Sequence, residues 1–169
     1  MTMGDLEILM AEAMVPGGAT IADQLIVLPV VLSMLFGAAL LCMRRRVERH
    51  APVAVVGLAV VLLVDLELLR RVAADGPMTM MMGGWKAPFG IAFTLDLMGA
   101  LFLAVAGFVA LACGLYATAS VPRTELRYGF FPFLFLMMAG VSGAFLTGDI
   151  FNLYVWFEVL LIASFGLIV

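Results

Sequence analysis

One acid, Glu158, stands in an apolar and aromatic stretch, and residues 150–169 contain no other charged residue. If a helix enters a bilayer at Asp149, Glu158 lies nine residues later. At ~1.5 Å per residue that is about 13 Å deep, near the middle of a ~30 Å hydrocarbon core. A carboxylate there costs about 2.5–3.5 kcal/mol on insertion scales, so we expect a protonatable group in an ion or proton path. The alternative is a neutral acid that donates a hydrogen bond to a neighbouring helix.

Other acids near apolar segments have more ordinary explanations. Asp149 is expected to be the N-cap of the helix that carries Glu158, with a role in proton uptake as the alternative. Asp96 is expected to cap the third apolar segment. Glu67 and Arg71 have the i, i+4 spacing of an ion pair at the membrane boundary. Asp65 lies about one turn deeper than Glu67 and is a second candidate for a role in transport.

The composition indicates an integral membrane protein. The chain is 65% hydrophobic and 12% charged, with a mean hydropathy of +1.19, whereas soluble domains are roughly 45–50% apolar. Long unbroken apolar runs predict helices and not the alternating strands of a membrane barrel. Cys42 and Cys113 lie inside apolar runs and do not indicate a disulfide or a metal site. The sequence shows no phosphate-binding, zinc-binding or nucleophile motif, so we expect no cofactor, no metal and no nucleic-acid partner.

The predicted fold is an all-α polytopic membrane protein with about five transmembrane helices. The predicted spans cover about residues 25–43, 51–69, 95–116, 128–146 and 150–169. Residues 1–24 form a leader that is either an interfacial helix or disordered. Closely spaced turn residues in 72–94 predict a short extracytoplasmic hairpin, with Met78 starting one arm and Trp85 the other.

Small residues make the fourth predicted span locally thin. Gly140, Gly143 and Ala144 belong to small-xxx-small pairs, which let another helix approach closely. The adjacent fifth span is the expected partner, and its approach would shield Glu158 from lipid. Generic helix packing is the alternative.

The positive charges predict the orientation of the spans. One side of the membrane holds the loops 44–50 and 117–127 with six arginines, and the other holds three basic residues. The six are Arg44, Arg45, Arg46, Arg49, Arg123 and Arg127, and the three are Arg70, Arg71 and Lys86. This difference predicts that the two loops are cytoplasmic and that the N-terminus lies outside.

Two motifs together resemble a known family. They are Gly-Gly-Trp-Lys-Ala-Pro-Phe-Gly-Ile at 83–91 and the stretch 145–164, which includes Thr-Gly-Asp-Ile-Phe-Asn-Leu-Tyr-Val-Trp-Phe-Glu. The chain resembles the D-type subunit of the Mrp-type multisubunit cation/proton antiporters from about residue 25 to 169. More broadly, it resembles the antiporter-like membrane subunits of respiratory complex I and of membrane-bound hydrogenases.

The resemblance implies a mechanism that this chain contains only in part. Members of the family have about fourteen helices, including two inverted five-helix repeats. The acid that matches Glu158 pairs with a lysine on a later helix, and this pair gates proton movement. The only lysine here is Lys86, which lies in a loop, and a second repeat is absent. The chain therefore resembles the N-terminal third of such a subunit, or one part of a split subunit.

The expected function is that of a membrane subunit of a Na⁺/H⁺ antiporter in a bacterial or archaeal inner membrane. Its expected partners are other membrane subunits, protons, Na⁺ and the lipid bilayer. One alternative is a proton-pumping membrane subunit of an NADH:quinone oxidoreductase or hydrogenase-type complex, which would make the chain part of an enzyme. Another is a truncated structural remnant without transport. The sequence leaves open which cation is coupled.

Overall fold

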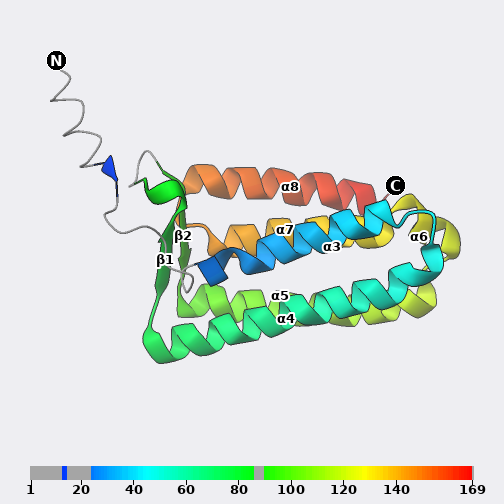
Figure 1. The fold of residues 1–169 in the computed structure, drawn as a ribbon, viewed down its shortest axis with the longest axis horizontal. Helices are drawn as coiled ribbons and strands as arrows, with labels where there is room; N and C mark the ends of the chain where they lie inside the picture. The colour runs from blue at the N-terminus through cyan, green and yellow to red at the C-terminus, as the bar shows by residue number, and fades with distance from the viewer. Residues whose placement is uncertain (1–12, 15–23, 86–89, 169) are drawn as a thin grey trace, which may run out of the picture.

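The computed structural model describes residues 13–14, 24–85 and 90–168, and it forms an elongated bundle of helices. Figure 1 shows five long helices side by side, with a two-stranded hairpin at one end and a short helix at the other. The long helices are α3 (Leu28–Cys42), α4 (His50–Asp75), α5 (Leu97–Ser120), α7 (Phe130–Leu146) and α8 (Ile150–Ile168). Four helical segments are long and apolar enough to cross a membrane, and the first of them, Leu25–Cys42, joins the 3-10 turn Leu25–Val27 to α3. α7 is also apolar, but its 17 residues fall just below that length. The predicted fold class, an all-α polytopic membrane protein, is confirmed.

Two helices run past the predicted ends of their spans. α4 continues to Asp75 where the span was expected to end near residue 69, and α5 continues to Ser120. The added residues of α4 include arginine and alanine, which have good helix propensity, so the helix extends beyond its apolar part. It stops at Gly76, whose φ of 91° is readily adopted only by glycine and whose N–H donates to the Val72 carbonyl at 3.0 Å.

A short antiparallel hairpin joins α4 to α5. Strand β1 (Met78–Met81) pairs with β2 (Ala92–Leu95), in a register that places Met78 opposite Leu95. The predicted non-spanning hairpin is therefore present, but its second arm begins at Ala92 and not at Trp85. The chain first makes a 3-10 turn over Met82–Gly84, where Gly83 has a φ of 67°, and this turn ends the first arm. Residues 86–89 lie outside the described residues.

The hairpin also holds the turn that precedes α8. The Gly148 N–H donates to the Ala92 carbonyl at 2.9 Å, and Phe93 and Thr147 form an isolated β-bridge. The Phe93 side chain is buried in the core at the hairpin end of the bundle. Because β2 is anchored in this way, the starting point of α8 is fixed relative to the rest of the bundle.

Helix α7 lies at the centre of the packing and contacts α3, α4, α5 and α8. Its buried residues include Phe131 and Phe135, both completely enclosed, together with Gly140 and Gly143. α4 and α5 pack on each other through regularly spaced stripes of buried residues. α8 is different, because only Asn152 and Ala163 are buried among its described side chains.

The two ends of the bundle differ in the number of arginines that they carry. The α3–α4 connection and the short helix α6 (Arg123–Tyr128) lie at one end, and the hairpin lies at the other (Figure 1). The six arginines counted above as one group therefore gather at the α6 end, while Arg70 and Arg71 lie near the hairpin. The orientation of this arrangement in a membrane stays a prediction. Of the leader 1–24, the structure describes only residues 13, 14 and 24, so its predicted character lies outside the described residues.

Candidate functional site

Glu158 is the ninth residue of the 19-residue helix α8, close to the middle of that helix. At ~1.5 Å per residue it lies about 12 Å from the start of α8. Its side chain is half-buried, whereas Tyr154 and Ile162, one turn before and after it, are exposed. Glu158 therefore lies at the edge of a helix face that this bundle leaves uncovered.

The described residues offer the Glu158 carboxyl one polar neighbour on its own helix. Tyr154 lies one turn before it on α8. The two ion pairs among the described residues both belong to Glu67, so neither involves Glu158. A cationic partner for Glu158 would have to approach from the uncovered side of α8.

The first turn of α8 is fixed by a local network around Thr147. The Asn152 side-chain amide donates to the Thr147 hydroxyl at 2.9 Å. The Phe151 N–H donates to an Asp149 carboxylate oxygen at 2.9 Å, which is the geometry of an N-cap. Asp149 thus occupies the capping position that the sequence predicts, and it lies at the hairpin end of α8, because the preceding Gly148 is bonded to β2.

The contact between α7 and α8 depends on two glycines. A Cβ added at Gly140 would lie 2.9 Å from the Leu160 backbone nitrogen, and one added at Gly143 would overlap the Trp156 ring. These are two of the three small residues that the sequence singles out, and both face α8. Ala144 is half-buried. The close approach holds α8 against the bundle on the side opposite to its uncovered face.

Asp65 has a different environment from that of Glu158. It lies on the buried stripe of α4, is 0% exposed, and neither carboxyl oxygen has a hydrogen-bond partner among the described residues. It sits in a notch at Gly107 of α5, where an added Cβ would lie 2.5 Å from an Asp65 carboxyl oxygen. Asp65 is ten residues before the end of α4, and Gly107 is ten residues after the start of α5. Both are therefore about 15 Å from the hairpin end, a depth similar to that of Glu158.

The complete burial of Asp65 is the feature that sequence reasoning missed. The signal was available in the heptad-like spacing of Leu58, Val61, Asp65 and Leu68, all of which are buried on one face of α4. Without knowledge of the facing helix, that spacing does not tell whether Asp65 is enclosed or faces an aqueous cavity.

Glu67, Arg70 and Arg71 form a cluster of ion pairs near the hairpin end of α4. Glu67 accepts from Arg71 at 2.8 Å, as the sequence predicts, and also from Arg70 at 2.7 Å. Within the described ranges, no three His, Cys, Asp or Glu side chains are grouped to hold a metal ion.

Comparison with known proteins finds similar chains among curated proteins and among solved structures. No family model matches the chain. The D-type subunit of the Na⁺/H⁺ antiporter of Alkalihalophilus pseudofirmus is 36% identical over 147 residues, which cover 87% of this chain and 30% of that protein. Among solved structures, the Mrp complex from a Dietzia species has a TM-score of 0.79 at 28% identity over 87% of this chain and 27% of the other.

A second solved structure extends the likeness to a redox complex. The membrane-bound sulfane sulfur reductase, an archaeal respiratory membrane complex, has a TM-score of 0.72 at 26% identity over 85% of this chain and 30% of the other. The chain thus spans about a third or less of the proteins it matches. The resemblance to the D-type subunit of Mrp-type antiporters, expected from the two motifs, is confirmed for most of this chain.

Proposed function

Given this likeness, we propose that the chain is part of a membrane subunit of a multisubunit Na⁺/H⁺ antiporter and that Glu158 carries the proton. The observation that supports the proposal is the position of Glu158. It is the only charged residue of α8, lies near the middle of that helix, and borders a face that the bundle leaves uncovered. Acids placed in this way inside membrane helices commonly serve ion pathways.

The proposed mechanism uses a fixed acid and a moving cation. The α7–α8 contact at Gly140 and Gly143, and the attachment of Gly148 to β2, hold the Glu158 carboxyl at a constant depth. A cationic side chain approaching the uncovered face would stabilise the carboxylate, and its departure would favour the neutral acid. The proton is then taken up or released as that cation moves, and the two groups titrate as a coupled pair.

Other acids have secondary roles in this proposal. Asp65 is a second candidate proton carrier, which its burial without a partner among the described residues favours. Its enclosure between α4 and α5 is an argument against rapid proton exchange, so we place it after Glu158. Asp149 acts as a cap in this account, and a part in proton uptake is subordinate to that role.

The membrane arrangement is proposed on the same basis. The arginine-rich α6 end lies in the cytoplasm, the hairpin lies outside, and the host membrane is a bacterial or archaeal inner membrane. The coupled cation is proposed to be Na⁺, by analogy with the Na⁺/H⁺ antiporter relative.

A second candidate function is that of a proton-pumping membrane subunit of a redox-driven complex. The likeness to the sulfane sulfur reductase complex favours it. The two functions predict different co-purifying subunits. An antiporter subunit would co-purify with further small membrane subunits, whereas a subunit of a redox complex would co-purify with iron–sulfur or flavin subunits.

Replacement of Glu158 by Gln in the complete complex tests the proposal. In proteoliposomes with an imposed Na⁺ gradient, we expect proton flux through Glu158→Gln to fall to the level of protein-free vesicles. The matched control is Glu125→Gln, which removes an exposed acid from α6 and should keep full flux. Co-purification of all subunits establishes assembly of each variant. Normal flux through an assembled Glu158→Gln complex would contradict the proposal.

A further inference from the structure

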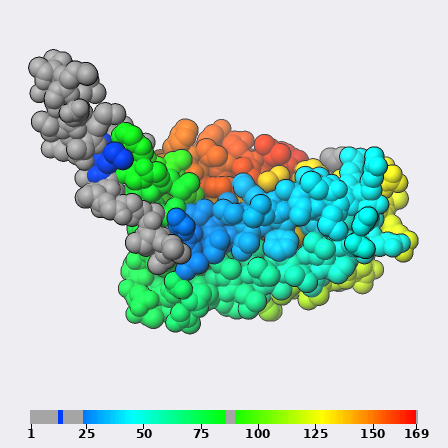
Figure 2. All heavy atoms as spheres, viewed as in Figure 1, coloured from blue at the N-terminus to red at the C-terminus, as the bar shows by residue number. Residues whose placement is uncertain are grey.

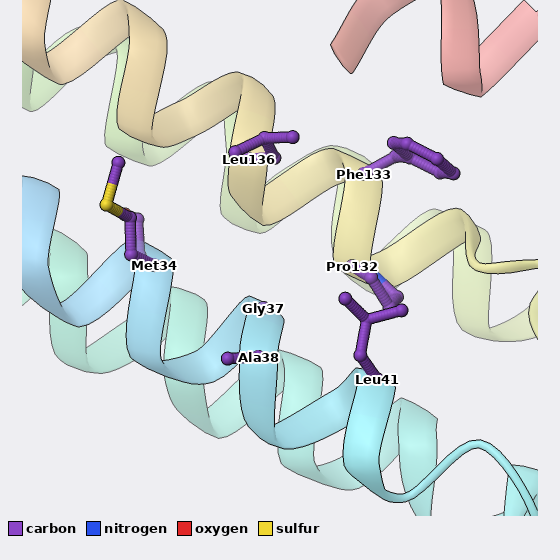
Figure 3. Close-up of a pocket in the computed structure, with 8 residues that line it drawn as sticks. Met34, Gly37, Ala38, Leu41, Pro132, Phe133 and Leu136 are labelled. Atoms are coloured by element: carbon purple, nitrogen blue, oxygen red, sulfur yellow. The ribbon is translucent and has the colours of Figure 1, made fainter. Parts of the chain in front are cut away.

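A groove lies between α3 and α7 on the apolar surface of the bundle. It has a volume of about 260 Å³, and its lining is apolar. Most of the lining comes from Met34, Ala38, Leu41, Pro132, Phe133 and Leu136. Figure 3 shows Met34 and Leu41 projecting from α3 toward α7, with Leu41 pointing to Pro132. The groove therefore has the shape and surface to hold a hydrocarbon chain.

Small residues on α3 create the groove. Gly37 is buried against α7, where an added Cβ would lie 3.4 Å from the Pro132 carbonyl oxygen. Ala38, the next residue, is exposed and leaves space above the contact. Figure 2 shows α7 only as a strip between α3 and α8, so the groove opens where α7 is recessed.

A basic depression lies just beyond the α6 end of the groove. Arg44, Arg45 and Arg127, together with Val47, line a hollow of about 630 Å³. Arg44 follows the groove residue Leu41 by three positions, and Arg127 precedes Pro132 by five, so both walls of the groove lead to arginines. All three arginine side chains are exposed, and the ion pairs found among the described residues include none of them.

We propose that these two features together bind one phospholipid with an anionic headgroup. The acyl chain lies in the α3–α7 groove, and the headgroup phosphate is held by Arg44, Arg45 and Arg127. Guanidinium groups suit phosphate oxygens because they donate paired hydrogen bonds. Basic pockets between transmembrane helices are a recognised setting for anionic headgroups. The nearby acid Glu125 lines a different depression, with Tyr128 and the end of α8, and so does not oppose the phosphate in this hollow.

The test uses photoreactive lipids on the complete complex in nanodiscs. Phosphatidylglycerol and phosphatidylcholine, each with a photoreactive group in the acyl chain, are compared by mapping cross-linked peptides. We expect phosphatidylglycerol to label residues 34–41 and 132–136 in preference to phosphatidylcholine. Because each of these arginines would donate charge-assisted hydrogen bonds to the headgroup phosphate, the preference should fall at least about tenfold for each of Arg44, Arg45 and Arg127 changed to Gln.

Two matched controls separate the headgroup and the chain. Changing Arg46, Arg49 and Arg123 to Gln removes the same number of charges from the same end and should keep the preference, because these residues do not line the hollow. Ala38→Phe fills the groove and should abolish labelling. Ala39→Phe, at an exposed neighbouring position that does not line the groove, should leave labelling intact.

Four results would overturn the proposal. Equal labelling by the two lipids, or a preference that survives the Arg44, Arg45 and Arg127 changes, would exclude headgroup recognition. Binding of inorganic phosphate that depends on Arg44, Arg45 and Arg127, with no effect of these changes on lipid labelling, would point to a site for the free ion. Absence of labelling in the groove of the native complex would show that another helix covers it.

Discussion

The α4–α5 contact and the α7–α8 contact each place an acid at a similar depth beside a helix that approaches at a glycine. In the first, Asp65 fits the notch at Gly107 and is completely enclosed. In the second, Gly140 and Gly143 admit α8, but Glu158 lies to the side of that contact and remains half-buried. The first contact is complete within this chain, whereas the second leaves its acid at the edge of an uncovered surface.

The difference bears on which of the two acids we propose as the proton carrier. A carboxylate enclosed without a partner is costly by several kcal/mol, and no polar neighbour among the described residues offers Asp65 a route to water. Glu158 has Tyr154 one turn before it on α8 and an open side that another helix can approach. This comparison supports our proposal that Glu158, the less buried of the two acids, transfers the proton.

The largest difference in stability is expected between alanine variants of the two helix contacts that depend on glycine. Gly143→Ala should destabilise the protein by about 1–3 kcal/mol, because the new methyl group overlaps the Trp156 ring. Gly107→Ala meets only the end of the Asp65 side chain and Leu62, so its strain should be smaller, and the ~1 kcal/mol gain in helix propensity that both variants share should offset most of it. Equilibrium unfolding in mixed micelles measures both. Equal destabilisation by the two variants would show that the α4–α5 notch is as rigid as the α7–α8 contact.

The helix caps should give an intermediate effect that is local to each region. Asp96 accepts from the Gly99 N–H at 2.7 Å at the start of α5, and Asp149 caps α8. Asp96→Ala and Asp149→Ala should each cost ~1 kcal/mol and should raise hydrogen exchange only in the first turn of the helix that was changed. Asp149→Asn keeps the cap and should keep proton flux. Loss of flux in Asp149→Asn, with α8 still protected, would instead give Asp149 a direct part in proton uptake.

The smallest effect is expected at the boundary ion pairs. Glu67 bonds to both Arg70 and Arg71, but all three side chains reach solvent, and such pairs contribute little to stability. Glu67→Gln should change the unfolding free energy less than either cap variant, and the change should shrink further at high salt. A change as large as that of Asp96→Ala, independent of salt, would mean that these pairs are shielded in the complex.

The sequence predicts those elements whose causes are local. The apolar runs, the caps at Asp96 and Asp149, and the i, i+4 pair of Glu67 with Arg71 each depend on neighbouring residues, and the structure contains all of them. Features that depend on distant partners were not predicted. The start of β2 at Ala92 follows from pairing with β1 and from the Gly148 hydrogen bond, and neither is visible in the local pattern.

The candidate site divides in the same way. Glu158 is conspicuous in the sequence because a single acid interrupts a long apolar run. The enclosure of Asp65 depends on Gly107, 42 residues away in the chain, and on the antiparallel packing of α4 and α5. The lysine side chain that would pair with Glu158 is predicted only by the family resemblance.

The central claim is that Glu158 takes up and releases the proton, and infrared difference spectroscopy tests it most directly. The complete complex is switched between Na⁺-free and Na⁺-containing buffer, and the carbonyl band of a protonated carboxylic acid is recorded. We predict a Na⁺-dependent band that is lost in Glu158→Gln and retained in Asp65→Asn, with both variants fully assembled. A band that persists in Glu158→Gln and disappears in Asp65→Asn would transfer the role to the enclosed acid and contradict this account.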